Sequence, residues 1–298
     1  MLTHQFIVSF LIAVTQLLTG ILINGFIIVV NAVDFIRQRR IAPLDLIICC
    51  LVSSRICLQL LIFLTYLVHF SLMNPSVLEE ISLIFVFINI WGHWLSTWLG
   101  VFYCAKIAAF PHPLFFWLRM RISKLVPWLI LGSTLYASIS SGIQDKHTWT
   151  MTQKYLVNIF SSNATKTKEV NIVPLCILIF HLTLPLIIFL ITVLLLILSL
   201  GRHAQKMRTI ATGTRDPRSG APVKAMLSIL SFLILHFSHY MLAVLFFSSV
   251  FQFGTFIFGF FTFLSGIYPS IHSVILILGN VKLKQNAKKY LFCGQYHQ

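Results

Sequence analysis

Charged residues are scarce in this chain and are missing altogether from long intervals. Only 10% of the 298 residues are charged, whereas a soluble protein averages about 25%. Residues 225–281 contain no Asp, Glu, Lys or Arg, a run more than twice the roughly 20 apolar residues that cross a bilayer once. A soluble fold of this length could not bury so much apolar surface, including 27 Phe. The composition therefore predicts a membrane protein.

Other charge-free intervals extend this pattern along the chain, and a polar break near residues 248–254 divides the longest run in two. Each span is expected to be a helix, because backbone polar groups in lipid must be satisfied within the segment. We therefore predict an all-α membrane protein, a seven-transmembrane helix bundle forming one domain over residues 1–298. The seven spans are predicted at residues 6–33, 44–70, 81–106, 125–143, 171–200, 225–250 and 257–279, with longer loops at 144–170 and 201–224.

Acidic residues are few, with 7 Asp and Glu against 22 Lys and Arg. The net charge of +15 could indicate nucleic acid, but the basic residues gather on alternate segments between the spans. This positive-inside bias predicts a multi-pass membrane protein with its N-terminus outside and its C-terminus inside. The expected partner is the lipid bilayer, and no nucleic acid is expected. The basic residues assigned to the cytoplasmic side are Arg37, Arg39, Arg40, Lys106, Arg119, Arg121, Lys124, Arg202, Lys206, Arg208, Arg215, Arg218, Lys224, Lys282, Lys284, Lys288 and Lys289.

The predicted outer segments lack cysteine and any sizeable domain. Without cysteine there, no disulfide can join the third span to the long outer loop, which separates this chain from the commonest class of seven-helix receptors. The first run reads as a span and not as a signal peptide, which leaves only Met1–Gln5 as an outer tail. Any ligand is therefore expected to be a small molecule that enters the bundle.

Arg55 is an arginine inside a span, about eleven residues from its inner end and roughly 16 Å deep at 1.5 Å per residue. Such a cation must face the bundle and find acceptors. With no acid nearby, we expect those acceptors to be Asn24, backbone carbonyls and a serine such as Ser273. A structural polar contact between three helices and a contact that rearranges during switching are both open. Asp45, which follows Pro43, is interpreted as a helix-start residue.

Polar residues in the outer halves of the spans are the candidates for ligand contact. On the third span Asn89 and His93 share a helical face with Phe85, and hydrogen-bonding groups at that depth need a partner, water or ligand. His181 and His239 are similar candidates on later spans. His236 and His239 could form a metal pair, but a third ligand with suitable spacing is missing. No metal or cofactor is therefore expected.

Two features lie outside the spans. Asn163-Ala164-Thr165 is an N-glycosylation sequon in a segment assigned to the outside. Residues 282–293 alternate apolar and lysine residues, which predicts a short cytoplasmic amphipathic helix on the inner leaflet.

The segment from Thr97 to Ala108, TWLGVFYCAKIA, resembles the third-helix signature of the type 2 (bitter) taste receptors. Similarity continues nearly end to end, through Asn24-Gly25, Pro43-Leu44-Asp45, Ser54-Arg55, Leu58-Gln59, Ser199–His203, Ser231–Leu235 and His272–Leu278. The resemblance implies a G-protein-coupled receptor that detects bitter small molecules and activates gustducin-type heterotrimeric G proteins.

The resemblance also implies roles for particular residues. Tyr103 and Lys106 stand where other receptors carry their inner switch, and His272-Ser273 replaces the usual seventh-helix motif. The implied ligand positions are Phe85, Asn89, His181, His239, Phe246, Thr262 and Ser265. Many family members carry tryptophan near Phe85 and tyrosine at His239, so the range of agonists is expected to differ.

Two other classes were weighed against a receptor. A seven-helix transporter or channel would show inverted repeats and ionisable groups at the midplane, where only Arg55 qualifies. An intramembrane enzyme would need paired acids, a metal set or a Ser–His pair, and the spans hold a single acid, Asp45. A receptor is predicted, and no enzymatic activity is expected.

Overall fold

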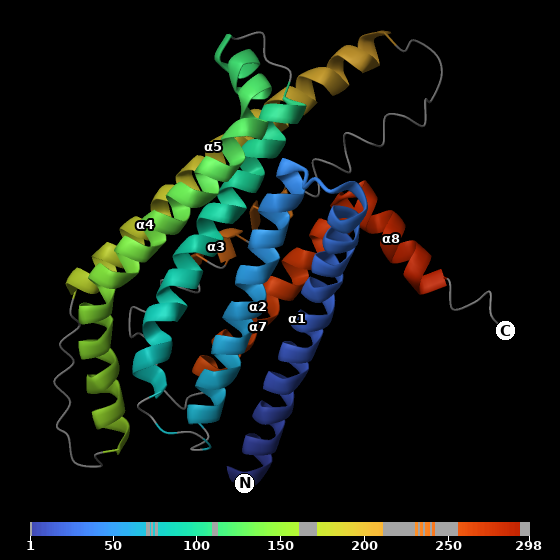
Figure 1. Ribbon diagram of the computed structural model, residues 1–298. Helices are drawn as coiled ribbons and strands as arrows, with labels where there is room; N and C mark the ends of the chain where they lie inside the picture. The colour runs from blue at the N-terminus through green and yellow to red at the C-terminus, as the bar shows by residue number, and fades with distance from the viewer. Residues whose placement is uncertain are drawn as a thin grey trace.

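The computed structural model describes residues 2–69, 72, 74, 77–108, 113–160, 172–210, 230–231, 233–234, 236–238, 240–241 and 256–292. Within these ranges the regular secondary structure is entirely α-helical, and no strand occurs. Figure 1 shows the helices aligned along a common direction, with α8 leaving the bundle at the end where α1 meets α2. The helices are α1 (Leu2–Gln38), α2 (Pro43–His69), α3 (Val77–Ile107), α4 (Pro113–Phe160), α5 (Ile172–Ile210), α7 (Phe256–Gly279) and α8 (Val281–Phe292).

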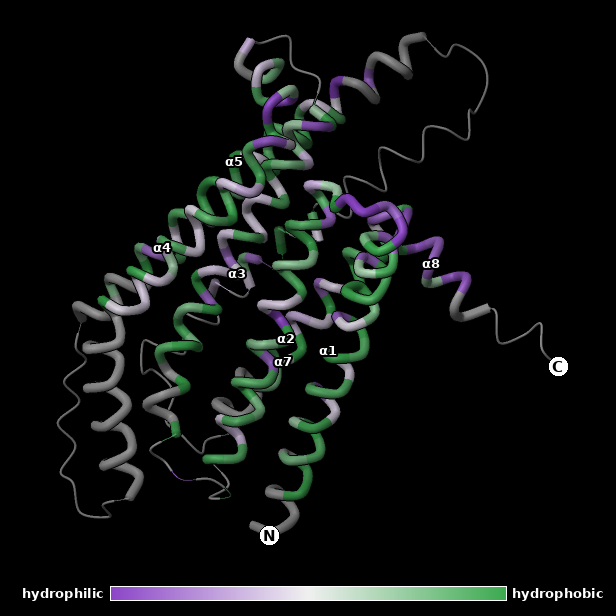
Figure 2. Tube along the Cα trace, viewed as in Figure 1, coloured by the Kyte–Doolittle hydropathy of each residue, from purple (hydrophilic) through white to green (hydrophobic). Residues whose placement is uncertain are grey.

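In the described part of the chain, five helices are long and apolar enough to cross a membrane. The α7–α8 pair, bent by 95°, would add a sixth if taken together. The span predicted at 225–250 lies mostly outside the described residues. Figure 2 shows mainly hydrophobic colour along the helices, with hydrophilic colour gathered on the α1–α2 turn, on α8 and at the upper ends of α4 and α5. The five candidate spans are Phe10–Gln38, Pro43–Val68, Leu83–Ile107, Phe115–Ile143 and Ile179–Arg202.

Two helices continue well beyond their predicted spans, which corrects the predicted loops. α4 runs to Phe160, although a loop was expected from residue 144, and α5 runs to Ile210. The α4 extension contains no proline or glycine, and the α5 extension contains no proline and only one glycine, Gly201, at its start. Charge shows where a helix leaves the apolar layer, but it does not end the helix.

α3 lies at the centre of the packing and contacts α2, α4 and α5, while α1 contacts α2 and α7. The largest core cluster is buried between these helices and includes Ile27, Ile48, Leu51 and Leu95. Apolar residues on the outer faces of the bundle remain exposed, such as Leu22 at 72%. In lipid such exposure is the expected state of a spanning helix.

The 95° bend between α7 and α8 falls at Asn280. Its Oδ1 accepts hydrogen bonds from the backbone N–H groups of Lys282 (3.0 Å) and Leu283 (3.3 Å). These are the bonds of a helix N-cap, which satisfy two of the donors left free in the first turn of α8. The cap fixes where α8 begins and thereby places Lys282 against the ends of α1 and α2.

Candidate functional site

Arg55 is buried at 4% exposure and its guanidinium connects three helices. Its Nη1 donates to Ser273 Oγ at 2.8 Å. Ser273 Oγ in turn lies 2.6 Å from Asn24 Oδ1 and 2.9 Å from the Pro269 carbonyl, so its hydroxyl proton is shared between two acceptors. The predicted acceptor Ser273 is confirmed, and Asn24 is reached through it. We call Asn24, Arg55 and Ser273 the Arg55 knot.

The Arg55 knot leaves part of the arginine uncompensated. Arg55 Nη2 has no hydrogen-bond partner among the described residues, and no ion pair there involves Arg55. A buried charge held only by neutral acceptors depends strongly on each of them. The knot is therefore sensitive to the relative position of α1, α2 and α7.

A second set of polar contacts, not assigned from the sequence, extends the knot toward the N-terminal end of α1. Gln59 Nε2 donates to Ser270 Oγ at 2.9 Å, and Gln16 Nε2 donates to the Phe263 carbonyl at 2.7 Å. Gln59 lies one helical turn from Arg55, and Ser270 one turn from Ser273. This i, i+4 and i, i+3 spacing is the signal that could have found the pair. Gln16 carried no comparable signal.

Lys282 on α8 joins the C-terminal end of α1 to the N-terminal end of α2. Its Nζ lies 2.8 Å from Asp34 Oδ2, 2.8 Å from Asp45 Oδ2 and 2.9 Å from Asn31 Oδ1. Partial burial lowers the pKa of Lys282, but hydrogen bonds to the two carboxylates outweigh it, so that the pKa lies above its ordinary value. Lys282 thus stays charged at neutral pH. Interpreting Asp45 only as a helix-start residue was incomplete, because it also holds α8.

Lys282→Met is expected to lower the thermal stability of the receptor by about 1 kcal/mol, because it leaves Asp34 and Asp45 without their cation at a partly exposed site. The measurement is the unfolding temperature of the detergent-solubilised protein. Lys284→Met removes the same charge from an exposed position two residues away and serves as the control. Equal unfolding temperatures for the two variants would contradict a holding role for Lys282.

The outer candidates do not meet in one cavity among the described residues. Phe85 packs against an apolar cluster that includes Leu58 and Ile62. His181 Nδ1 lies 2.6 Å from the Tyr136 hydroxyl of α4. His239 and Phe246 lie outside the described residues, as does Asn163. For Thr262 and Ser265 the structure describes the α7 backbone only.

His93 bonds to its own helix and contacts His236 of the sixth predicted span. Its Nδ1 donates to the Asn89 carbonyl at 2.8 Å, while its ring stands edge-on to His236 with centroids 5.1 Å apart. His236 also contacts Phe189 of α5, at 4.9 Å between centroids. His93, a ligand candidate, and His236, a member of the suggested metal pair, thus form an aromatic contact that links α3 through His236 to α5. No group of three metal-ligating side chains occurs in the described part of the chain.

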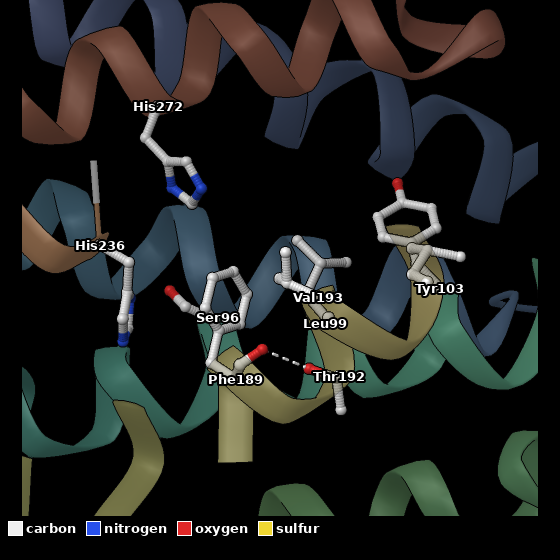
Figure 3. Close-up of a pocket in the computed structure, with 10 residues that line it drawn as sticks. Ser96, Leu99, Tyr103, Phe189, Thr192, Val193, His236 and His272 are labelled. Carbon is white, nitrogen blue, oxygen red and sulfur yellow. Dashed lines mark hydrogen bonds between the residues drawn. The ribbon is translucent and has the colours of Figure 1, made fainter. Parts of the chain in front are cut away.

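A small cavity lies beside this contact (Figure 3). Its volume is about 30 Å³, enough for one or two waters but not for an agonist. In Figure 3 the rings of His236 and His272 approach it at one end, and Tyr103 stands at the other. Of the predicted residues only Tyr103 and His272 line it, and both were assigned to switching. Its lining is Ser96, Leu99, Gly100, Tyr103, Phe189, Thr192, Val193, Leu196, His236 and His272.

The C-terminal end of α3 carries Tyr103 and Lys106, the residues predicted to act in switching. Lys106 is exposed, and its Nζ donates to the Arg119 carbonyl of α4 at 3.3 Å and lies 6.0 Å from the centroid of the Phe102 ring. Arg202 is exposed near the end of α5. Residues 211–224 of the predicted basic loop lie outside the described residues. The exposed cations therefore border the same end of the bundle as α8.

The long apolar helices, held together by the Arg55 knot, define a multi-pass helical membrane protein. Comparison with known proteins gives the family. The family model described as "Taste receptor protein (TAS2R)" matches residues 1–295. The chain therefore belongs to this family, the type 2 or bitter taste receptors.

Individual relatives are similar over almost the whole chain. Taste receptor type 2 member 1 of Pan paniscus is 52% identical over 98% of both chains, and that of Pongo pygmaeus is 51% identical over the same shares. Taste receptor type 2 member 119 of Rattus norvegicus is 49% identical over 98% of this chain and 87% of its own. The protein is a signalling receptor and not an enzyme, responding to ligands and coupling to G proteins. Its fold class is the seven-helix bundle of its family.

Proposed function

We propose that this receptor detects bitter small molecules in a pocket in the outer half of the bundle and activates gustducin-type heterotrimeric G proteins. The observation that carries the proposal is the family match over residues 1–295. Residues 1–298 then form one receptor domain in the plasma membrane, with an extracellular N-terminus, a cytoplasmic C-terminus and a glycan on Asn163.

The proposed agonist pocket is built from side chains near the outer ends of four helices. Asn89 lies one turn outward from His93, and Phe85 one turn further. His181, His239, Phe246, Thr262 and Ser265 complete the proposed set. No Asp or Glu lies in the outer half of any predicted span, so a buried ammonium group would lack the partner that its desolvation requires. The pocket is therefore proposed to favour apolar or neutral hydrogen-bonding agonists.

The affinity expected for such a pocket is modest. A neutral hydrogen bond contributes about 1 kcal/mol net, and a micromolar dissociation constant corresponds to about −8 kcal/mol. A few hydrogen bonds together with aromatic contact reach that range. The pocket would then bind many bitter chemotypes weakly and would not bind a single compound tightly.

The path from agonist to G protein is proposed to pass through His93. Its ring contacts His236 at 5.1 Å, and His236 contacts Phe189 at 4.9 Å beside the inner cavity. An agonist held by Asn89 would bias this contact, and the unfilled space between His236, His272 and Tyr103 allows the side chains to change rotamer. Opening of the inner end would then expose the region around Tyr103 and Lys106.

Asn89→Ala is expected to raise the half-maximal concentration of hydrogen-bonding agonists about fivefold, equivalent to the loss of one hydrogen bond of about 1 kcal/mol. Purely apolar agonists should shift less. The measurement is the calcium response of transfected cells. Ser138→Ala removes an exposed hydroxyl that bonds only to the Thr134 carbonyl of its own helix (2.9 Å) and is the control. A screen in which most agonists are permanently cationic, and in which Asn89→Ala leaves the responses unchanged, would contradict the proposed pocket.

A cell assay tests the proposed function as a whole. Cells expressing the receptor with a gustducin-type α subunit should give calcium responses to a subset of bitter compounds, and cells without that subunit should respond less. A response that is independent of the α subunit would overturn the gustducin assignment while leaving the receptor assignment in place.

A further inference from the structure

Four exposed residues form a stripe along the inner part of α4. Trp117, Arg121, Lys124 and Trp128 follow one another at spacings of four, three and four residues, which places them on one helical face. Trp117 is 49% exposed and Trp128 70% exposed, and both cations are exposed as well. The Arg121 guanidinium carbon lies 5.5 Å from the centroid of the Trp117 ring. We call these four residues the α4 stripe.

The α4 stripe lies at one edge of the apolar layer. Residues 125–143 carry no charge and continue the candidate span Phe115–Ile143. Arg121 and Lys124 therefore stand where the hydrocarbon meets the headgroups. The two tryptophans are about 16 Å apart along the helix at 1.5 Å per residue, and they bracket this boundary at the depth that tryptophan prefers.

Among the described residues, no carboxylate pairs with the cations of the α4 stripe. Both ion pairs of the described residues belong to Lys282, which takes up Asp34 and Asp45. α4 itself carries no Asp or Glu between Pro113 and Ile143. Two cations on a lipid-facing surface, without a carboxylate of their own, match the phosphate of a lipid headgroup.

A second copy of the chain fits this surface poorly. Two copies in one membrane would be related by a two-fold axis along the membrane normal, so the same patch would meet itself at equal depth. Arg121 would then face Arg121, and Lys124 would face Lys124, with no carboxylate between them. Charge therefore favours a lipid over a partner receptor.

We propose that the α4 stripe binds an anionic phospholipid of the cytoplasmic leaflet, with the phosphate between Arg121 and Lys124. The leaflet rests on the orientation proposed above, while the recognition chemistry does not. The tryptophan rings flank the headgroup, and the acyl chains run along exposed Leu131 and Leu135, which are 50% and 56% exposed. The site goes beyond agonist detection, because it ties the receptor to the charge of its membrane.

The test uses the full-length receptor in nanodiscs of phosphatidylcholine containing phosphatidylserine, with retained lipids counted by native mass spectrometry. Loss of each of the two cations that hold the phosphate is expected to weaken binding about fivefold, so Arg121→Gln/Lys124→Gln is expected to reduce phosphatidylserine binding about 25-fold. The control Arg37→Gln/Arg40→Gln removes the same charge from two exposed positions, one in the last turn of α1 and one in the α1–α2 turn, and should retain binding.

A conservative variant separates a lost site from a misfolded receptor. Arg121→Lys/Lys124→Arg keeps both cations and should retain phosphatidylserine. Equal losses in the stripe variant and the α1 control would overturn the proposal in favour of bulk electrostatics. A wild-type receptor that retains phosphatidylcholine as strongly as it retains phosphatidylserine would also overturn it. So would Leu131→Cys receptors that cross-link to each other regardless of phosphatidylserine.

Discussion

Arg55→Ala is expected to remove most of the receptor from the cell surface and to abolish signalling by what remains. The substitution takes away the bond to Ser273 and the bulk of a side chain that is 4% exposed. A hydrogen bond to a charged group contributes about 1.5–3 kcal/mol, and the space left behind adds to the loss. Total folding stabilities are about 5–15 kcal/mol, so this single substitution removes a large part of the stability of the fold. Surface labelling and the agonist dose response measure the outcome.

Two further variants show whether the knot acts as a unit. Arg55→Met keeps similar volume without the charge, whereas Ser273→Ala leaves the guanidinium buried without its direct acceptor. Because an uncompensated buried charge costs more than its removal, Ser273→Ala should be at least as damaging as Arg55→Met. Normal expression of Arg55→Ala, with an unchanged dose response, would count decisively against the knot as a structural requirement.

Charge reversal at Lys106 and Arg202 is expected to uncouple the receptor from its G protein. Lys106→Glu/Arg202→Glu replaces two exposed cations at the inner ends of α3 and α5, where the opened bundle is proposed to meet the G protein. Agonist-stimulated nucleotide exchange should fall to a small fraction of the wild-type value, while surface expression and agonist binding persist. Like-charge contacts across an interface cost several kcal/mol, which accounts for the size of the effect.

The matched control is Lys106→Gln/Arg202→Gln. Glutamine at 106 keeps a donor for the Arg119 carbonyl, which Lys106 contacts at 3.3 Å, so the α3–α4 contact survives while the charge is lost. Coupling should fall less than with charge reversal. Full efficacy in the charge-reversal variant would show that these cations do not contribute to G-protein engagement.

The helical architecture could be predicted from the sequence because charge and hydropathy act locally. Long charge-free runs mark segments that must be helical in lipid, and α1, α2, α3 and α5 cover their predicted spans or nearly so. The ends of α4 and α5 were harder to place, because polar helix beyond the membrane carries no signal in the charge pattern. Only glycine or proline would have marked a stop, and neither occurs between Ile143 and Phe160.

The contacts of the site also differ in how far the sequence could predict them. Arg55 could be assigned its acceptor because a buried cation leaves few choices. The contacts of Lys282 could not be foreseen, since they join positions 237 and 248 residues apart along the chain. They exist only because the 95° bend turns α8 toward α1 and α2. The inner cavity likewise depends on how Phe189 and His236 pack across helices, which no spacing rule supplies. The outer agonist residues stay predictions.

The most direct test of the central claim is agonist-driven nucleotide exchange by purified receptor reconstituted with a gustducin-type G protein. Neutral bitter compounds should accelerate exchange in a saturable manner for the wild-type receptor, and Lys106→Glu/Arg202→Glu should bind them without accelerating it. A receptor that binds neutral bitter compounds yet never changes the rate of exchange would contradict the account.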